Sequence, residues 1–295
     1  MFFNTLHRLR GYNLLELLVA MAIVSALILL FNQIVSSASI TTRLSQTRID
    51  AVTQAQQVMD RMMLDFAQMP IRKDIDYRFA KASGNDSFSF YSATDGLYPS
   101  TASVSSTTSR TLSIIGYKIA TATVGSGTGP VLMRGARQLD WASNGPACSA
   151  MCYTLVDGTG GQTQKLEDGS SNTLPSVNST ASNYQVLGDL IFRMEICFLV
   201  STSSTAASVL QTTLPDNISK LSAIVVAVAV LDEKSRYGIT DYSKLISAFG
   251  DAEDGKDILS VWSPVLSNSG FASKAGVSPR AAQTVRIFQR YFYLK

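Results

Sequence analysis

Residues 10–31 read RGYNLLELLVAMAIVSALILLF, and this stretch governs how the rest of the chain is interpreted. One carboxylate, Glu16, stands at the front of an apolar run in which Ser25 is the single polar side chain. No Asp, Glu, Lys or Arg follows Glu16 until Arg43. A charge near the centre of a bilayer costs roughly 2.5–3.5 kcal/mol on insertion scales. Glu16 therefore requires a partner for its charge if this run enters a membrane.

The apolar run predicts a helix that crosses a membrane. A spanning helix needs about 20 predominantly apolar residues, and the uncharged stretch reaches Thr42. Arg8 and Arg10 precede the run without any acid beside them. Basic residues before a span stay in the cytoplasm, so we expect a single span with the N-terminus inside and the remainder of the chain outside.

A small-residue cleavage site after the apolar region would mark an ordinary secretory signal. Here the attractive site lies before that region, between Gly11 and Tyr12. Cleavage there would leave a chain that starts at Tyr12, keeps the apolar helix and has Glu16 as its fifth residue. The alternative is a plain signal anchor in which Glu16 reaches back to the membrane interface; it leaves the Gly11 junction unexplained.

The stretch GYNLLELLVA, residues 11–20, resembles the prepilin class of proteins, which comprises type IV pilins and type II secretion pseudopilins. Tyr12 stands where that family usually has Phe. The resemblance implies that a prepilin peptidase cleaves between Gly11 and Tyr12 and methylates the new N-terminus. It also implies a bacterial inner-membrane protein with a periplasmic head, which later enters a pilus or pseudopilus.

The same resemblance gives Glu16 a role in assembly. In the family, this glutamate is thought to attract the N-terminal amine of a neighbouring subunit. Opposite charges attract strongly in a low dielectric, and each offsets the cost of burying the other. The partners implied are thus other pilin or pseudopilin subunits, contacted through their N-terminal helices.

Composition argues against several other classes of function. The chain has 25 basic and 22 acidic residues; removal of Arg8 and Arg10 with the leader leaves 23 and 22. There is no basic patch of the kind that nucleic acid requires. The single histidine, His7, lies in the leader, so histidine-based catalysis and histidine-rich metal sites are not expected. We expect no enzyme activity, cofactor or metal; Ser-Lys or carboxylate chemistry remains open, but no spaced constellation supports it.

Three cysteines bear on the compartment. Cys148 and Cys152 lie four residues apart in a Gly/Pro/Ser-rich stretch, and outside the cytoplasm a disulfide between them is plausible. Cys197 lies in a strand-like run, where we expect a buried free thiol.

Residues 43–69 are polar but keep a helical period. One apolar stripe recurs at spacings of three and four residues: Val52, Ala55, Met59, Met62 and Phe66. The opposite face carries polar side chains that include Gln54 and Arg61, and Pro70 ends the helix. This half of the helix is expected to pack one face on a sheet.

The remainder of the chain predicts strands separated by loops. The expected strands are 87–93, 111–120, 131–141, 184–200, 218–231 and 285–294, with 111–120 and 131–141 forming a hairpin around a surface turn at Gly125–Pro130. Residues 100–110 and 157–183, rich in Ser, Thr, Gly and Asn, are expected to be exposed loops. The apolar run 223–231 should be a central strand covered by the helix.

Two features precede the closing strand. Residues 240–249 predict a short helix capped by Thr240 or Asp241, with Gly250 after its end. An acidic loop follows, which is read as solvated; calcium is the alternative, since calcium takes oxygen ligands. The loop carries Asp251, Glu253, Asp254 and Asp257.

The predicted fold class is α+β, with a long N-terminal helix packed on antiparallel sheets as in pilins. We expect a leader at 1–11, a transmembrane and assembly half of the helix at 12–42, an amphipathic half at 43–69 and an extracytoplasmic β-rich head at 70–295.

Short motifs in the head resemble J-type minor pseudopilins and the large W-type minor pilins. They are Tyr117-Lys118 and Leu132-Met133-Arg134 in the hairpin, followed by residues 186–193 and 214–230. The tail at 290–294 is similar to prepilin-like proteins of the Verru_Chthon cassette group. The resemblance implies a minor subunit at or near the tip of a type II secretion pseudopilus or type IV pilus. The alternative is a membrane-anchored binding module for a secreted substrate or surface, with residues 157–183 as the segment whose deletion would separate the two.

Overall fold

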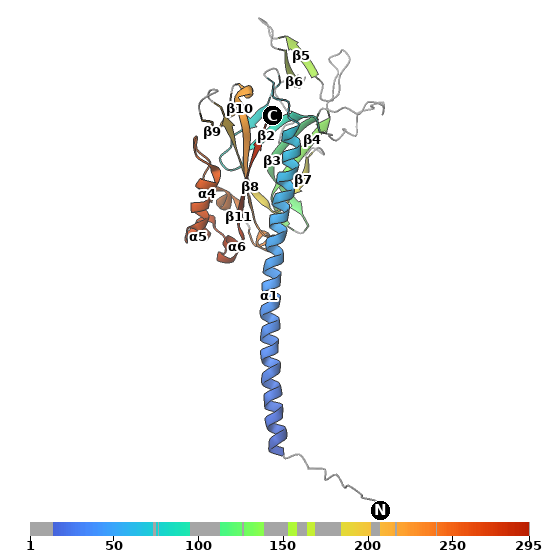
Figure 1. Ribbon diagram of the computed structural model, residues 1–295, viewed down its shortest axis with the longest axis vertical. Coiled ribbons are helices and arrows are strands. Elements are labelled where there is room, and N and C mark those ends of the chain that lie inside the picture. The colour runs from blue at the N-terminus through green and yellow to red at the C-terminus, as the bar shows by residue number, and fades with distance from the viewer. Residues whose placement is uncertain are drawn as a thin grey trace, which may run out of the picture. The chain divides into compact units, whose positions relative to one another are not determined.

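The computed structural model divides the chain into two units that meet between Ile49 and Asp50. It describes residues 14–72, 75, 77–94, 113–125, 127–138, 153–157, 164–168, 184–201, 207–215, 217–239 and 241–294. The first unit holds the front of one long helix, and the second holds the end of that helix with all the strands (Figure 1).

Helix α1 spans Leu14–Ala67 and contains 54 residues. Its sequence contains neither Gly nor Pro, the two residues that most disfavour a helix interior. At 1.5 Å per residue it is about 80 Å long. Pro70 follows three residues after its end, in agreement with the predicted stop.

The second unit contains two main antiparallel sheets. The first sheet has the order β1-β2-β3-β4-β7, and the second has the order β11-β10-β8-β9. The first is built from β1 (Arg78–Ala80), β2 (Ser87–Ser92), β3 (Ser113–Val124), β4 (Gly127–Gln138) and β7 (Tyr184–Gly188). The second is built from β8 (Ile191–Val200), β9 (Val209–Gln211), β10 (Leu221–Val230) and β11 (Arg286–Tyr293), with a 3-10 turn at Ile218–Lys220 before β10. The predicted α+β class, a long N-terminal helix with antiparallel sheets, is confirmed.

The predicted hairpin forms, but its turn is tighter than expected. Strands β3 and β4 pair in continuous register from Ser113↔Gln138 to Val124↔Gly127. Pairing therefore includes residues 127–130, which the glycine content had suggested were part of a surface turn. Gly125, with a φ of 60°, supplies the left-handed backbone that the turn requires.

The predicted strand over 184–200 is two strands in two sheets. Strand β7 ends at Gly188 in the first sheet, and β8 begins at Ile191 in the second. A Cβ at Gly188 would lie 3.1 Å from Val58 Cγ2 of α1, so glycine allows this close approach. Gln54 accepts a hydrogen bond from the Leu190 amide at 2.8 Å and thereby holds the turn. Hydrophobic periodicity continues through the turn, and for this reason the pattern did not reveal the change of sheet.

One predicted loop contains a strand. Within residues 157–183, which had been expected to form an exposed loop, β6 (Gln164–Asp168) pairs antiparallel with β5 (Tyr153–Asp157). A polar strand with a single central leucine lacks the alternating apolar pattern by which strands are recognised.

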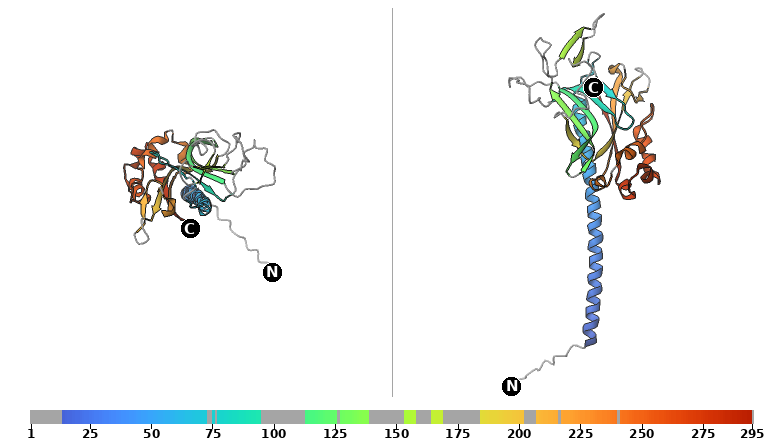
Figure 2. Two further views of the ribbon diagram at one scale, coloured as in Figure 1. Left: turned by 90° about the horizontal axis from the view of Figure 1, so that it is seen from above. Right: turned by 180° about the vertical axis from the view of Figure 1, so that it is seen from behind.

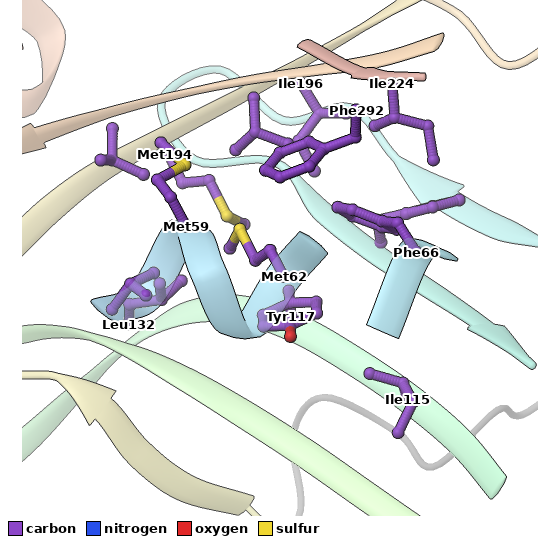
Figure 3. Packing of buried hydrophobic residues seen from close by; sticks show 14 of the residues in the cluster. Met59, Met62, Phe66, Ile115, Tyr117, Leu132, Met194, Ile196, Ile224 and Phe292 are labelled. Atoms are coloured by element: carbon purple, nitrogen blue, oxygen red, sulfur yellow. The ribbon is translucent and has the colours of Figure 1, made fainter. Parts of the chain in front are cut away.

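The main core of the second unit lies between α1 and the two sheets. Figure 3 shows Met59, Met62 and Phe66 of α1 between residues of both sheets, with Tyr117 on one side and Ile224 on the other. The predicted stripe is buried except at its first member: Ala55, Met59, Met62 and Phe66 are covered, while Val52 is half-buried. The amphipathic half of the helix therefore serves two sheets rather than one.

A second core covers the opposite face of the sheet that contains β10. It is formed by short helices that follow β10 in the sequence: α2 (Glu233–Tyr237), α3 (Tyr242–Ala248), α4 (Ile258–Ser267), α5 (Phe271–Ala275) and α6 (Pro279–Thr284). Figure 2 shows these helices on the side of that sheet away from β3 and β4. Both faces of β10 are thus buried, which explains its unbroken apolar sequence. Helix α3 and the closing strand β11 were predicted; the other helices were not.

Candidate functional site

Within the first unit, the segment Leu14–Thr42 presents an apolar helix surface with one charged residue, Glu16. Sixteen large apolar side chains between Leu14 and Ile40 are each 47–80% exposed. The described segment Leu14–Thr42 is long and apolar enough, by length and composition, to cross a membrane. None of its most apolar window is buried by the rest of the protein. An exposed apolar surface of this extent is typical of a site that contacts a membrane or another protein.

Three hydroxyl groups within the segment Leu14–Thr42 bond to the backbone of their own helix. Ser25 donates to the Met21 carbonyl at 2.8 Å, Thr41 to Ser37 at 3.0 Å and Thr42 to Ala38 at 2.9 Å. Such bonds to the carbonyl four residues earlier satisfy a hydroxyl without any outside partner. These residues are therefore compatible with an apolar environment.

Glu16 differs from these hydroxyls. It lies in the first turn of α1, where the positive end of the helix dipole favours a carboxylate. No Lys or Arg of the described segments lies within ion-pair distance of it. The span therefore carries a single formal charge, placed where the helix tolerates it and open to a cation from elsewhere.

Several predicted site residues lie outside the described residues. These are Gly11 and Tyr12 of the expected processing site and Cys148 and Cys152 of the possible disulfide. Cys197 is described, and it is a buried free thiol as expected. Its burial raises the pKa of the thiol to about 12, so it stays protonated and unreactive at neutral pH.

A buried ionic cluster in the second unit anchors α1 to the first sheet, and sequence reasoning did not find it. Asp65 on α1 is fully buried. Arg134 of β4 donates to both its oxygens, Nε to Oδ2 at 2.6 Å and Nη2 to Oδ1 at 2.9 Å. Tyr117 of β3 donates to Oδ2 as well. Arg61, one turn earlier on α1, lies 3.4 Å from Oδ1.

The cluster joins two of the motifs that the sequence singled out. Tyr117 and Arg134 are cross-strand partners in the β3–β4 ladder, so both side chains reach the same point under α1. Burial, followed by the charge and hydrogen bond of Asp65, raises the pKa of Tyr117 well above its usual value. Burial alone would lower the pKa of Arg134, but the hydrogen bond and charge of Asp65 outweigh that effect and raise it. The one available signal for Asp65 was an acid on the apolar stripe, directly before Phe66.

The acidic loop is engaged by protein donors. Its contacts are Asp251 with Arg193 at 2.7 Å, Glu253 with Lys256 at 2.7 Å, Asp254 with the Thr212 amide at 2.7 Å, and Asp257 with Tyr291 at 2.6 Å. Among the described residues no group of three His, Cys, Asp or Glu could hold a metal ion. The loop carboxylates pin the segment after α3 to the second sheet, and the calcium alternative gains no support.

Comparisons with known proteins do not establish a family for this chain. No protein-family model matches the chain, and no curated protein matches it either. Among solved structures, a type IV-like pilin from Thermus thermophilus is similar, with 10% identity over 83% of this chain and 94% of that chain and a TM-score of 0.31. At this identity and TM-score the likeness carries no functional weight, so the function has to be argued from the chain's own residues.

Proposed function

We propose that the chain is a minor pilin or pseudopilin subunit. A prepilin peptidase cleaves it between Gly11 and Tyr12, and the N-terminal helix then assembles into a type II secretion pseudopilus or a type IV pilus. Before assembly the helix holds the protein in the bacterial inner membrane, with the N-terminus in the cytoplasm and the head in the periplasm. The observation that carries this proposal is the lone Glu16 at the start of the exposed apolar helix, five residues after Gly11.

Charge pairing supports the assembly step. Removal of the leader exposes an amine at residue 12, and a neighbouring subunit in the same membrane brings its own amine near Glu16. When the amine pairs with Glu16, the carboxylate is no longer a desolvated charge without a counter-ion. Removal of either partner would leave the other charge buried and unpaired, which is strongly unfavourable. The two charges thus favour one axial offset between neighbouring helices.

The head supports a minor rather than a bulk role. Helices α2–α6 add a second core on the outer face of one sheet, beyond what is needed to cover α1. A large head is easier to accommodate at a tip or at low copy number than along a tightly packed shaft. The Tyr117 and Arg134 motifs, which meet at Asp65, support a position close to J-type minor pseudopilins or W-type minor pilins.

The test of this proposal is Glu16→Gln in the full chain, produced together with its natural assembly partners. Gln keeps the size and polarity of the side chain and removes its charge. We expect the variant to insert into the membrane normally. We expect its amount in the sheared fibre fraction to fall at least about tenfold, because a loss of only about 1.4 kcal/mol of interaction free energy between subunits lowers the association constant tenfold. Ser25→Ala is the matched control, since that hydroxyl bonds only its own helix. Normal assembly of Glu16→Gln would refute the proposal.

A further inference from the structure

Strand β8 has one edge that β9 covers only in part. β9 pairs with Phe198, Leu199 and Val200, and no described strand pairs with the earlier residues of β8 on this edge. The connection between β1 and β2 fills this place with residues 82–86, here named the clasp. Asn85 and Asp86 of the clasp bond to the backbone of β8, mostly through their side chains.

The clasp bonds are specific. The Met194 amide donates to Asn85 Oδ1 at 2.9 Å, and the Ile196 amide donates to Asp86 Oδ2 at 2.9 Å. The Asp86 amide donates to the Met194 carbonyl at 3.2 Å. An amide left buried without an acceptor costs about 1–3 kcal/mol, so these contacts decide whether the edge of β8 is stable.

Glycine lets the clasp approach closely. Gly84 has a φ of 123°, which L side chains rarely adopt. A Cβ there would lie 3.1 Å from Ile246 Cγ2 of α3 and 3.3 Å from Arg193 Nη1 of β8. The Gly84 amide donates to Asp251 at 3.3 Å. The clasp therefore contacts the second sheet and the segment after α3 at once.

A buried charge cluster surrounds the clasp. Lys81 contacts both Asp86 Oδ2, at 3.4 Å, and Glu195. Arg193 Nη2 contacts Glu195 Oε2 at 2.8 Å and Asp251 Oδ1 at 2.7 Å. Two cations thus pair with three carboxylates, so carboxylates are in excess. Two further titratable groups lie nearby: the Cys197 thiol of β8, which stays protonated, and Asp254, whose pKa is lowered first by its hydrogen bonds with Thr212 and then by the charge of Lys81.

Asp86 is the carboxylate placed to hold a proton. Its side chain is fully buried, as is that of Glu195, but Glu195 pairs with both Arg193 and Lys81, whereas among the described residues Asp86 pairs with Lys81 alone, at 3.4 Å. We propose that the clasp is a proton-sensitive latch: a proton on Asp86 holds residues 82–86 on β8 and the segment after α3, and loss of that proton loosens them.

The direction of the effect follows from linkage. Burial first, and then the charge of Glu195, raise the pKa of Asp86 from 3.8 to about 6, although Lys81 opposes the shift. An Asp86 exposed by opening of the clasp returns to its ordinary pKa. The closed clasp therefore binds the proton more tightly than the open one, so closure is strongest near pH 4 and weakens as the pH rises to 6.

Hydrogen exchange at the Met194 and Ile196 amides tests this in the full chain in detergent micelles. After correction for the chemical rate at each pH, we expect protection of both amides to fall by up to about 100-fold between pH 4 and pH 7, as a shift of about two pKa units allows. Asp86→Asn should remove this dependence, because Asn keeps an acceptor and does not titrate. Asp60→Asn, which changes an exposed carboxylate of α1, should keep it.

Amide protection that does not change with pH in the natural chain would overturn the proposal, as would a pH dependence that persists in Asp86→Asn. If Asp86→Asn does not fold, NMR titration of the Asp86 carboxyl in the natural chain decides the question. A midpoint near pH 6 supports the latch, and a midpoint at or below pH 4 overturns it.

Discussion

Two carboxylates on the same helix have opposite surroundings. Asp65 is fully buried and receives hydrogen bonds from Tyr117 and a bidentate pair from Arg134. Glu16 stands on an exposed apolar surface and has no cation beside it in the described segments. The fold itself completes the environment of Asp65, whereas the described residues supply no partner for the charge of Glu16, which the proposed function assigns to a neighbouring subunit.

The contrast extends to the two units. In the second unit the apolar side chains face two internal cores, and the buried charges pair with one another. In the first unit the described apolar side chains face outward, and the hydroxyls of Ser25, Thr41 and Thr42 bond to the backbone of their own helix. One region is thus organised for its own stability, and the other exposes the apolar surface that the proposed function places against lipid and neighbouring helices. Changes in the two regions should therefore have separate effects.

The largest expected effect on stability comes from Asp65→Asn. Removal of its charge leaves Arg134 largely buried without a counter-ion, and a broken buried pair costs about 3–5 kcal/mol. Chemical denaturation of the full chain in detergent, followed by tryptophan fluorescence, to which the buried Trp262 contributes, measures this loss. Glu16→Gln should leave the same unfolding curve unchanged.

A second variant checks the cause. In Asp65→Asn with Arg134→Met the orphaned charge is gone, so we expect at least half of the lost stability to return. A loss below about 1 kcal/mol for Asp65→Asn, or an equal loss for Glu16→Gln, would remove the distinction between the two carboxylates.

An intermediate loss of stability is expected from Gly135→Ala, which tests the close packing of a side chain against the first sheet. A Cβ at Gly135 would lie 2.8 Å from the ring of Tyr184, which covers the cross-strand pair Gly116↔Gly135. Overpacking of this kind costs typically about 1–3 kcal/mol. The same denaturation measurement applies.

A double-mutant cycle with Tyr184→Ala isolates this contact. In the Tyr184→Ala background the added methyl group meets open space, so Gly135→Ala should cost much less there. Equal costs in both backgrounds would show that the ring over the glycine pair is not the cause.

The smallest effect is expected from Asp60→Ala. Asp60 lies on α1 five residues before Asp65 and pairs with Arg290 at 2.6 Å, but its side chain is 63% exposed. Exposed pairs contribute about 0.2–1 kcal/mol, so the unfolding free energy should change by less than about 1 kcal/mol and less still in high salt. A loss as large as that of Asp65→Asn would mean that burial does not set the importance of these carboxylates.

Much of the fold could be predicted because it rests on periodicity. The helix, its apolar stripe ending at Phe66, the β3–β4 hairpin and the apolar strand β10 all repeat at the spacing of their secondary structure. The division of residues 184–200 between two sheets could not be predicted this way, because the apolar pattern continues through the turn at Leu190.

The candidate residues divide in the same manner. Glu16 could be singled out from the sequence because it is one charge in an uncharged run, and its role in assembly stays a prediction. Asp65 and Asp86 could not, because their partners Arg134 and Ile196 are separated from them by 69 and 110 residues. Charge pairing across sheets depends on three-dimensional register, which residue spacing along the chain does not show.

The most direct test of the central claim is the N-terminus of the natural protein. Intact-mass and N-terminal analysis of the protein from native membranes should show a chain that begins at N-methylated Tyr12, with Glu16 as its fifth residue. A chain that still begins at Met1 in cells with an active prepilin peptidase would contradict the account and leave a signal-anchored envelope protein.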